Sequence, residues 1–302
     1  MPDVTTRAAK MARKTEHLRD FQRGATWPLH ACVIVTSDCQ LRCAFCAVGD
    51  MERGHHMEFG LFERAMRMFQ SHGMRAVELT GGDPFAWPHI DDAMRLCWDV
   101  GIQVGIQTNG IDMGKHADSL KFARWVRVSV YDVPQMAALK LNAIPWIPRL
   151  SLSTVYVDGM TEEFLSAYRQ YALNVGARSA RVVLDHFDGR QALKDEARTV
   201  VARLGEPLVL VERDEGVPVV CAEAWWKIVL DCEGWLYPCA EVGGHRLMKP
   251  PERLRTCHLD DAETFYSVAP YDLGHRCPTC AYRAHNAWLA PSLEPVVDED
   301  FL

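Results

Sequence analysis

The chain has 302 residues and a formal net charge of −7, with 48% apolar and 24% charged residues. This length suits one large α/β domain or one such domain with a small appendage, and the composition is that of an ordinary globular protein. No apolar run reaches the ~18 residues that span a bilayer, and the charged N-terminus lacks an apolar signal region, so we expect a cytoplasmic protein with no membrane partner. The negative charge argues against a large nucleic-acid footprint.

From residue 31 onward, short β-rich runs alternate with helical patterns. The expected strands are 31–36, 75–80, 102–108, 125–130, 149–157 and 179–185. Apolar spacing predicts helices at 59–73, 89–101 and 162–176, whereas 133–148 holds three prolines and has room for only about two helical turns. This rhythm favours an α/β fold, a partial and open (β/α)6 barrel of parallel strands.

Each expected helix carries an apolar stripe that we expect to face the core. The three stripes are Phe62, Ala65, Met66 and Phe69; then Ile90, Ala93, Met94 and Cys97; then Phe164, Ala167, Tyr168 and Tyr171.

A domain boundary is expected near residue 205, where glycine and proline become frequent and the remaining cysteines begin. The chain then divides into an N-terminal extension (1–30), the partial barrel (31–205) and a small C-terminal domain with a tail (206–302). In the last part, 225–239 predicts a β-hairpin whose strands flank a type I turn from Asp231 to Gly234.

The sequence TSDCQLRCAFCAVGD (36–50) places Cys39, Cys43 and Cys46 in a C-x3-C-x2-C pattern. A zinc site with its fourth ligand elsewhere is one interpretation. An iron–sulfur cluster is favoured, because closely spaced thiolates suit such clusters and the loop follows the first strand, at the barrel end where active sites form. Phe45 would shield this cluster from water. Eleven cysteines in a chain without a signal peptide also indicate metal or redox chemistry and not disulfides.

CxxxCxxC after the first strand resembles the signature of the radical S-adenosylmethionine (radical SAM) superfamily. The resemblance implies an enzyme with a 4Fe–4S cluster held by Cys39, Cys43 and Cys46. S-adenosyl-L-methionine would occupy the remaining position, and its reductive cleavage would give a 5′-deoxyadenosyl radical that takes a hydrogen atom from a C–H bond. A reductant such as flavodoxin or ferredoxin is the implied partner.

Three later segments also look like family motifs, each at the end of an expected strand. LTGGDP (79–84) is similar to a GGEP-type segment, with Asp83 in place of the commoner Glu, and QTNG (107–110) and VSVYD (128–132) are similar to segments that contact the ribose and carboxylate of S-adenosylmethionine. The resemblance therefore implies a cofactor-binding set of Gly81, Gly82, Asp83, Pro84, Asn109 and Ser129.

A second group of cysteines lies beyond residue 205. A C-x2-C pair and two separated cysteines resemble the twitch extension, a shortened SPASM domain, which implies a second, auxiliary 4Fe–4S cluster; zinc is the alternative. Its ligands would be Cys221, Cys239, Cys277 and Cys280. Cys232 is an alternative ligand, and Cys257 is either a neutral surface cysteine or the hydrogen-atom donor of an epimerase. Cys32 and Cys97 are expected to be packing residues.

The substrate stays open at this stage. A small polar metabolite (sugar, aminocyclitol or aminoglycoside), epimerised or dehydrogenated, ranks first, which makes the enzyme an isomerase or an oxidoreductase. Acidic clusters at Glu212, Asp214 and Glu215 and at Asp260, Asp261 and Glu263 would favour an ammonium group, although a solvated face explains them equally.

Three alternatives to that substrate class remain. One is modification of a nucleotide or nucleobase. Another is peptide modification. Such enzymes usually carry a leader-binding module before the barrel, and the ~30 residues that precede the first strand are few for such a module. The third is a non-catalytic iron–sulfur protein. His55 and His56 are expected at the surface, and the unassigned substrate-contact candidates are Arg178, Arg181, Asp185 and His186.

Overall fold

The computed structural model describes residues 27–46, 52–144, 147, 149–185, 189–212, 221, 224, 226–239, 255–267, 283, 286 and 287. Most of the expected N-terminal extension, His186, and the Cys277 and Cys280 pair lie outside these residues. In the described part, no helix combines the length and the apolar character needed to cross a bilayer.

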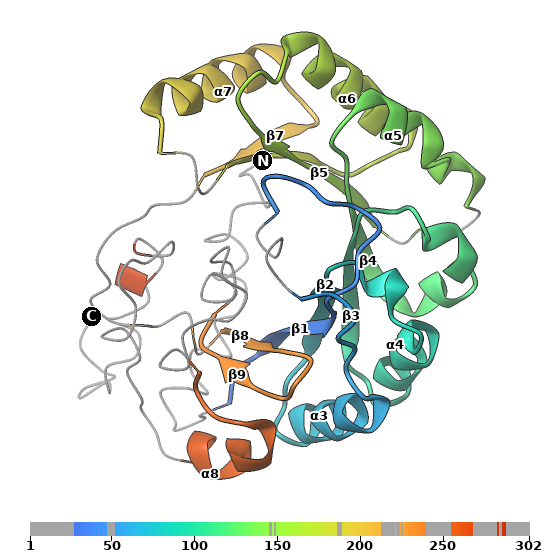
Figure 1. Ribbon diagram of the computed structural model, residues 1–302, viewed down its shortest axis with the longest axis vertical. Helices are drawn as coiled ribbons and strands as arrows, with labels where there is room; N and C mark the ends of the chain where they lie inside the picture. The colour runs from blue at the N-terminus through green and yellow to red at the C-terminus, as the bar shows by residue number, and fades with distance from the viewer. Residues whose placement is uncertain are drawn as a thin grey trace, which may run out of the picture.

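The described strands form one curved sheet in the order β7-β6-β5-β4-β3-β2-β1-β8-β9 (Figure 1). The strand bounds are β1 His30–Thr36, β2 Ala76–Gly81, β3 Gln103–Thr108, β4 Ala123–Ser129, β5 Leu150–Tyr156, β6 Ala180–Leu184, β7 Leu208–Val211, β8 Lys227–Leu230 and β9 Leu236–Tyr237. All neighbouring strands pair in parallel except β8 and β9, which are antiparallel. The sheet stays open between β7 and β9, so the partial barrel is confirmed.

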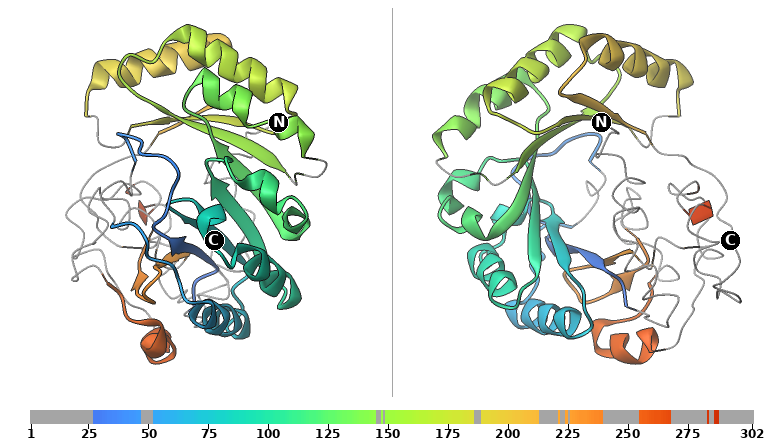
Figure 2. Two further views of the ribbon diagram at one scale, coloured as in Figure 1. Left: turned by 45° about the vertical axis from the view of Figure 1, so that its right-hand side comes forward. Right: turned by 180° about the vertical axis from the view of Figure 1, so that it is seen from behind.

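The helices cover the convex side of this sheet (Figure 2). Their bounds are α3 Phe59–Ser71, α4 Ile90–Asp99, α5 Val133–Ala138, α6 Glu162–Asn174, α7 Gln191–Leu204 and α8 Ala262–Tyr266. Short 3-10 turns complete the described elements: η1 Pro84–Ala86, η2 Met113–His116, η3 Ser119–Phe122, η4 Leu141–Ala143 and η7 Leu259–Asp261. Because parallel strands need crossover connections, this arrangement follows from the alternating pattern in the sequence.

Two of the three expected helix stripes match the buried residues. All four stripe residues of α3 and all four of α4 are buried. In α6 the prediction was partly wrong, because Leu165, Tyr168 and Ala172 are buried while Phe164 packs against the core only in part. The α6 face is therefore turned by about one residue from the predicted stripe.

The sheet continues past the boundary that we expected near residue 205. A seventh strand, β7, follows α7 and pairs in parallel with β6. The predicted hairpin is present as β8 and β9, and β8 pairs with β1 in the same sheet. A division at residue 205 would thus separate strands that share one ladder of hydrogen bonds.

Candidate active site

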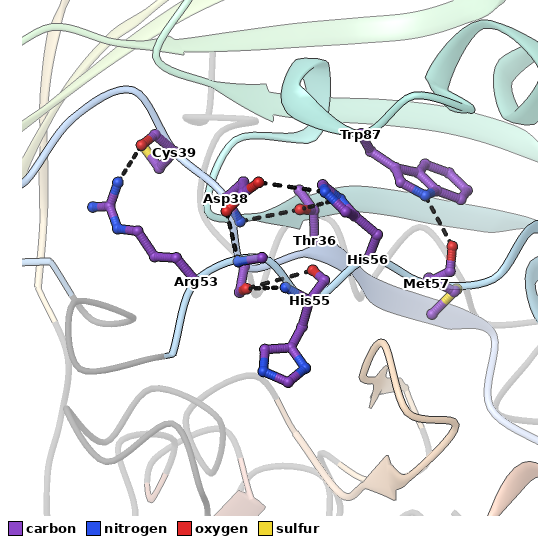
Figure 3. A network of polar contacts seen from close by, with 10 residues as sticks. Thr36, Asp38, Cys39, Arg53, His55, His56, Met57 and Trp87 are labelled. Atoms are coloured by element: carbon purple, nitrogen blue, oxygen red, sulfur yellow. Dashed lines mark hydrogen bonds and ion pairs between the residues drawn. The ribbon is translucent and has the colours of Figure 1, made fainter.

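The cysteine triad lies on the loop that leaves the carboxyl end of β1. Thr36 is the last residue of that strand, and it forms a bridge with His56 in the returning chain. The Thr36 hydroxyl lies 2.9 Å from His56 Nδ1, and His56 Nε2 lies 3.3 Å from the Asp38 carboxylate (Figure 3). Asp38 also accepts a 2.7 Å hydrogen bond from the Gly54 amide. The loop therefore leaves and rejoins the sheet at a fixed place.

Arg53 closes the first turn of the triad loop. Its guanidinium donates to the carbonyl oxygen of Cys39 (Figure 3). It also donates to the carbonyl oxygen of Leu41 at 2.6 Å. A planar guanidinium with several N–H groups can hold two carbonyls at once. Neither Arg53 nor Asp38 was singled out in the sequence, because both roles depend on a chain reversal that no local motif marks.

Gly81 and Gly82 bring the end of β2 against the triad loop. A Cβ on Gly81 would lie 2.1 Å from the Thr36 carbonyl oxygen, and one on Gly82 would lie 2.1 Å from that of Asp38. Gly81 also has φ +139°, a conformation that favours glycine. The close approach that these glycines permit is to the backbone of the triad loop, since the Gly82 amide donates to the Thr36 carbonyl at 2.8 Å.

Asp83 joins the ends of three strands from a fully buried position. Its carboxylate accepts hydrogen bonds from the Phe85 amide (3.0 Å), the Thr108 hydroxyl (2.8 Å) and the Asn109 amide (2.6 Å). Burial raises the pKa of Asp83 to about 6, although these three hydrogen bonds oppose the shift. Both oxygens are engaged inside the protein, so the side chain serves as an internal junction and not as an exposed ligand. Pro84, also buried, begins the turn η1.

Asn109 lies beside the first cysteine. Its side-chain amide donates to Cys39 Sγ at 3.5 Å and to the Gln40 side-chain oxygen at 2.8 Å. The Leu41 amide donates to the same sulfur at 3.4 Å. N–H groups directed at a ligand sulfur are one of the means by which proteins set the reduction potential of an iron–sulfur cluster.

Gln135, which the sequence analysis missed, ties the ends of β3 and β4 together. Its side-chain amide donates to the carbonyls of Asn109 (3.1 Å) and Ser129 (2.9 Å), and its oxygen accepts from the Tyr131 amide at 2.7 Å. Asp132 caps the helix α5 through the Gln135 amide at 2.7 Å. The Asp-x-x-Gln spacing of a capping box was the signal that could have identified this helix start.

The three thiols of the triad loop are of the ligand type that iron–sulfur clusters use. Among the described side chains, no three His, Cys, Asp or Glu groups converge closely enough to hold one metal ion. Burial, and then the neighbouring Cys46 and Cys39, raises the pKa of the Cys43 thiol to about 11. Iron would relieve this repulsion, because a coordinated thiol is deprotonated. In a four-iron cluster each cysteine binds its own iron, so the ligands surround a volume and need not meet at a point.

Aromatic side chains cover one side of the triad. The rings of Phe45 and Tyr131 lie 4.9 Å apart. Burial raises the pKa of the Tyr131 hydroxyl, with a hydrogen bond to Ser129 in opposition. Phe45 and Tyr131 thus pack together beside the triad, and the shielding of a cluster by Phe45 stays a prediction.

The C-terminal cysteines are only partly within the described residues. Cys221 and Cys239 are buried, whereas Cys277 and Cys280 lie outside the described residues, so the auxiliary cluster stays a prediction. The Cys257 carbonyl accepts a hydrogen bond from the Leu236 amide of β9, and its side chain packs against the hydrophobic core. Burial raises the pKa of the Cys257 thiol to about 12. That position suits packing; its role as a hydrogen-atom donor also stays a prediction. Burial likewise raises the pKa of Cys232, at the hairpin turn, to about 11.

The remaining candidates fall at several places. Cys97 is buried among the helices, and Cys32 is buried on β1. Arg178 precedes β6 and is exposed, so it lies at the amino end of that strand and not at the barrel mouth; Arg181 is within β6, and Asp185 follows it. His55 lies in the returning chain, where its amide binds the Ser37 hydroxyl at 2.9 Å.

Three of the four described acidic residues that suggested an ammonium-bearing substrate have partners of their own. Glu212 pairs with Arg198 at 2.6 Å, Asp260 with Arg64 at 3.2 Å and Glu263 with His72 at 3.3 Å. These pairs lie on the outer surface, as a solvated face would, and Asp214 and Glu215 are outside the described residues. They give no support to a cationic substrate.

The structure thus combines an open α/β barrel with a three-cysteine loop at the carboxyl end of its first strand. Residues 33–131 match the family model described as the radical SAM superfamily. This part of the chain is a radical SAM domain.

Several curated proteins are similar to this domain in sequence. A GTP 3′,8-cyclase of Moorella thermoacetica is 30% identical over 149 residues, which is 47% of this chain and 45% of that protein. A GTP 3′,8-cyclase of Heliobacterium modesticaldum is 33% identical over 104 residues, or 32% of each chain. The chain thus spans less than half the length of these two relatives.

Solved structures share the fold at low identity. The crystal structure of Streptococcus suis SuiB bound to the precursor peptide SuiA has a TM-score of 0.59 at 13% identity, covering 80% of this chain and 66% of that one. The structure described as native anSMEcpe with bound AdoMet also has a TM-score of 0.59 at 13% identity, covering 80% and 81%. These likenesses establish the fold alone.

Proposed function

We propose that the chain is a radical SAM enzyme that removes a hydrogen atom from a C–H bond of a small polar substrate. The observation that carries this proposal is the joining of three segments, the triad loop, the GGDP segment and the TNG segment, at the carboxyl ends of β1, β2 and β3. An electron carrier has no need of the last two segments.

The chain's own residues would hold the cofactors as follows. Cys39, Cys43 and Cys46 would bind the 4Fe–4S cluster, with Arg53 and Asp38 fixing the loop that carries them. When bound, the cluster and S-adenosylmethionine supply a carbon-centred radical that is strong enough to attack an unactivated C–H bond. Phe45 and Tyr131 would exclude water from that chemistry, which suits a reaction that water would interrupt.

The remaining assigned residues divide into two kinds. Gly81, Gly82 and Asp83 position the strand ends, because they contact the backbone of the triad loop and of Asn109 closely. Asn109 contacts Cys39 Sγ directly, and Ser129 lies on β4, two residues from Tyr131. All six residues of the set remain proposed as cofactor-binding residues: Gly81, Gly82, Asp83, Pro84, Asn109 and Ser129.

We place the substrate among small polar metabolites, such as a sugar, an aminocyclitol or an aminoglycoside, with epimerisation or dehydrogenation as the reaction. The face of the sheet away from the helices carries charged and hydroxyl side chains, including Glu78, Arg127 and Ser153, which suits a polar ligand. Modification of a nucleotide is the second candidate, because the curated relatives named above are GTP 3′,8-cyclases.

The test is an anaerobic reconstitution followed by measurement of iron, sulfide, zinc and 5′-deoxyadenosine after addition of dithionite and S-adenosylmethionine. We expect deoxyadenosine from the wild type and none from Cys43→Ala, with Cys97→Ala, a buried cysteine on a helix, as the matched control. About eight irons per chain would support a second cluster at Cys221, Cys239, Cys277 and Cys280, and about four with one zinc would replace it by a structural metal. Absence of deoxyadenosine with every candidate substrate would refute the enzymatic proposal.

A further inference from the structure

The concave face of the sheet carries a set of charged residues that the cofactor site does not use. On each central strand, the residues packed against the helices belong to the hydrophobic core, for example Val77 and Leu79 on β2 and Val126 and Val128 on β4. Side chains alternate along a strand, so the residues between them project to the opposite, concave face. The polar members of this face are Glu78, Gln107, Arg127, Ser151, Ser153, Arg181 and Lys227.

Glu78 is the buried carboxylate at the centre of this face, and it already has a cationic partner. Lys227 Nζ lies 2.5 Å from Glu78 Oε2, and Gln107 donates to the same oxygen at 2.9 Å. Burial alone would raise the pKa of Glu78, but Lys227, His30 and Arg127 outweigh it and hold the pKa far below its ordinary value. The negative charge of Glu78 is therefore compensated by Lys227.

Arg127, next in the chain of contacts, is attracted by Glu78, but among the described side chains no carboxylate forms a direct hydrogen bond with its guanidinium. Its guanidinium donates to the neutral side-chain oxygen of Gln107 at 3.2 Å and lies 5.0 Å from the ring of Trp125. Its Nε is buried and has no hydrogen-bond partner. Burial lowers the pKa of Arg127, which records the cost of holding this charge away from water. Within the described part of the chain, this guanidinium with five N–H donors makes one hydrogen bond and has no directly bonded anion.

Hydroxyl groups border this unused guanidinium. Arg127 is paired across the ladder with Ser151 of β5, and Ser153 of the same strand is paired with Arg181 of β6. Because strand residues rise about 3.3 Å each, Arg127 lies roughly 7 Å below Ser129, at the strand end. A group bound at Arg127 would therefore sit beneath the strand end that carries Ser129.

We infer that the concave face binds an anionic group of the substrate, a phosphate or a carboxylate, through the Arg127 guanidinium. Arg–phosphate and Arg–carboxylate pairs make two parallel hydrogen bonds, and the free Nε and terminal N–H groups of Arg127 are the donors for such a pair. The inference rests on the proposed function and deepens it, since it directs the search towards acidic sugars, sugar phosphates and nucleotides and away from aminoglycosides.

The test is a calorimetric titration of the reconstituted full-length protein with four ligands that share one carbon skeleton: glucose 6-phosphate, gluconate, glucose and glucosamine. Inorganic phosphate and acetate serve as probes without that skeleton. We expect at least one anion to bind about tenfold more tightly than its neutral or cationic counterpart, and Arg127→Met to remove that preference. Preference for phosphates or for carboxylates identifies which anion the site takes. Arg198→Met, which alters an exposed arginine, is the matched control and should change nothing.

Stability and activity readouts separate this inference from other failures. Arg127→Met should raise the Tm of the ligand-free protein, because burial of the guanidinium outweighs its attraction to Glu78. A lower Tm would give Arg127 a structural role and overturn the inference. Three other results would also overturn it. They are anion binding that Arg127→Met leaves unchanged, no anion binding at all, and a preference for glucosamine. If the wild type forms deoxyadenosine in any of these cases, the proposed function still stands. If the wild type forms no deoxyadenosine, the proposed function is refuted, while the anion-binding results still decide the inference about Arg127.

Discussion

Replacement of Gly82 by alanine tests the conclusion that the glycines of the GGDP segment exist to admit the triad loop. The new Cβ would lie 2.1 Å from the Asp38 carbonyl oxygen, 2.5 Å from its carbonyl carbon and 2.6 Å from the Ser37 oxygen. All three are backbone atoms, which cannot rotate away as a side chain would. The loop must therefore move by roughly 1 Å or more to restore normal contact distances.

The cost of Gly82→Ala can be worked from the contacts that such a movement breaks. The Gly82 amide donates to the Thr36 carbonyl at 2.8 Å, and the Asp83 amide donates to the Asp38 carbonyl at 2.6 Å. Each such bond contributes about 1 kcal/mol net, and overpacking adds about 1–3 kcal/mol. We expect Gly82→Ala to lower the free energy of unfolding by about 3–5 kcal/mol and to reduce the iron bound per chain.

Urea unfolding followed by circular dichroism measures the first effect, and iron analysis after anaerobic reconstitution measures the second. Gly60→Ala is the control, because Gly60 lies in α3 with no atom within 4 Å of the added Cβ, and alanine there should stabilise the helix by about 1 kcal/mol. A Gly82→Ala protein with normal iron content and a free energy of unfolding within about 1 kcal/mol of the wild type would refute the reasoning.

Four further predictions concern single positions. Because the folded-state pKa of Asp83 is raised from 3.8 to about 6, the wild type should lose about 3 kcal/mol of its free energy of unfolding as pH rises from about 4 to about 7. Asp83→Asn cannot lose this proton, so its free energy of unfolding relative to the wild type should rise by the same amount over that range. Urea titrations at successive pH values measure the difference. Glu78→Gln should lower the free energy of unfolding by about 3–5 kcal/mol at pH 7, because it leaves Lys227 without its carboxylate partner. Since the folded-state pKa of Glu78 is depressed, this loss should shrink as pH falls below about 4.5. A loss that stays constant with pH would contradict the pairing. Arg198→Ala breaks exposed ion pairs and should change the free energy of unfolding by less than about 1 kcal/mol, measured in the same way. Cys257→Ala removes a half-buried thiol, and if packing is its role, product yield measured by mass spectrometry should persist; deoxyadenosine formation without product would instead establish the hydrogen-atom donor.

The sheet and its helices were largely predictable because their signals are local. The apolar spacing in α3 and α4 reproduces the buried face of each helix, residue for residue. The hairpin turn was also marked locally, by Asp231, whose carboxylate accepts the Glu233 and Trp235 amides at 2.9 Å. The pairing of β8 with β1 could not be predicted, because the residues of a short strand do not indicate which distant strand it pairs with.

The candidate site was predictable in its motifs but not in its contacts. The cysteine spacing identified the triad loop, and the GGDP and TNG segments were found as strand ends. The internal role of Asp83 was missed, because an acidic residue in a loop is ordinarily expected to be exposed or to bind a ligand. Arg127 was missed for a different reason: arginine in an apolar strand has no local signature, and only the alternation of the folded sheet assigns it to the concave face.

The pairing of β8 with β1 also sets the order in which the protein is completed during synthesis. β1 ends at Thr36, but Lys227, the first residue of β8, is made 191 residues later. At about 5–20 residues per second, ribosomes need roughly 10–40 s to cover that distance. During this time one edge of β1 has unpaired backbone groups and is open to pairing with other chains. The strand that leads into the cysteine triad is thus among the last of the sheet to gain its second neighbour.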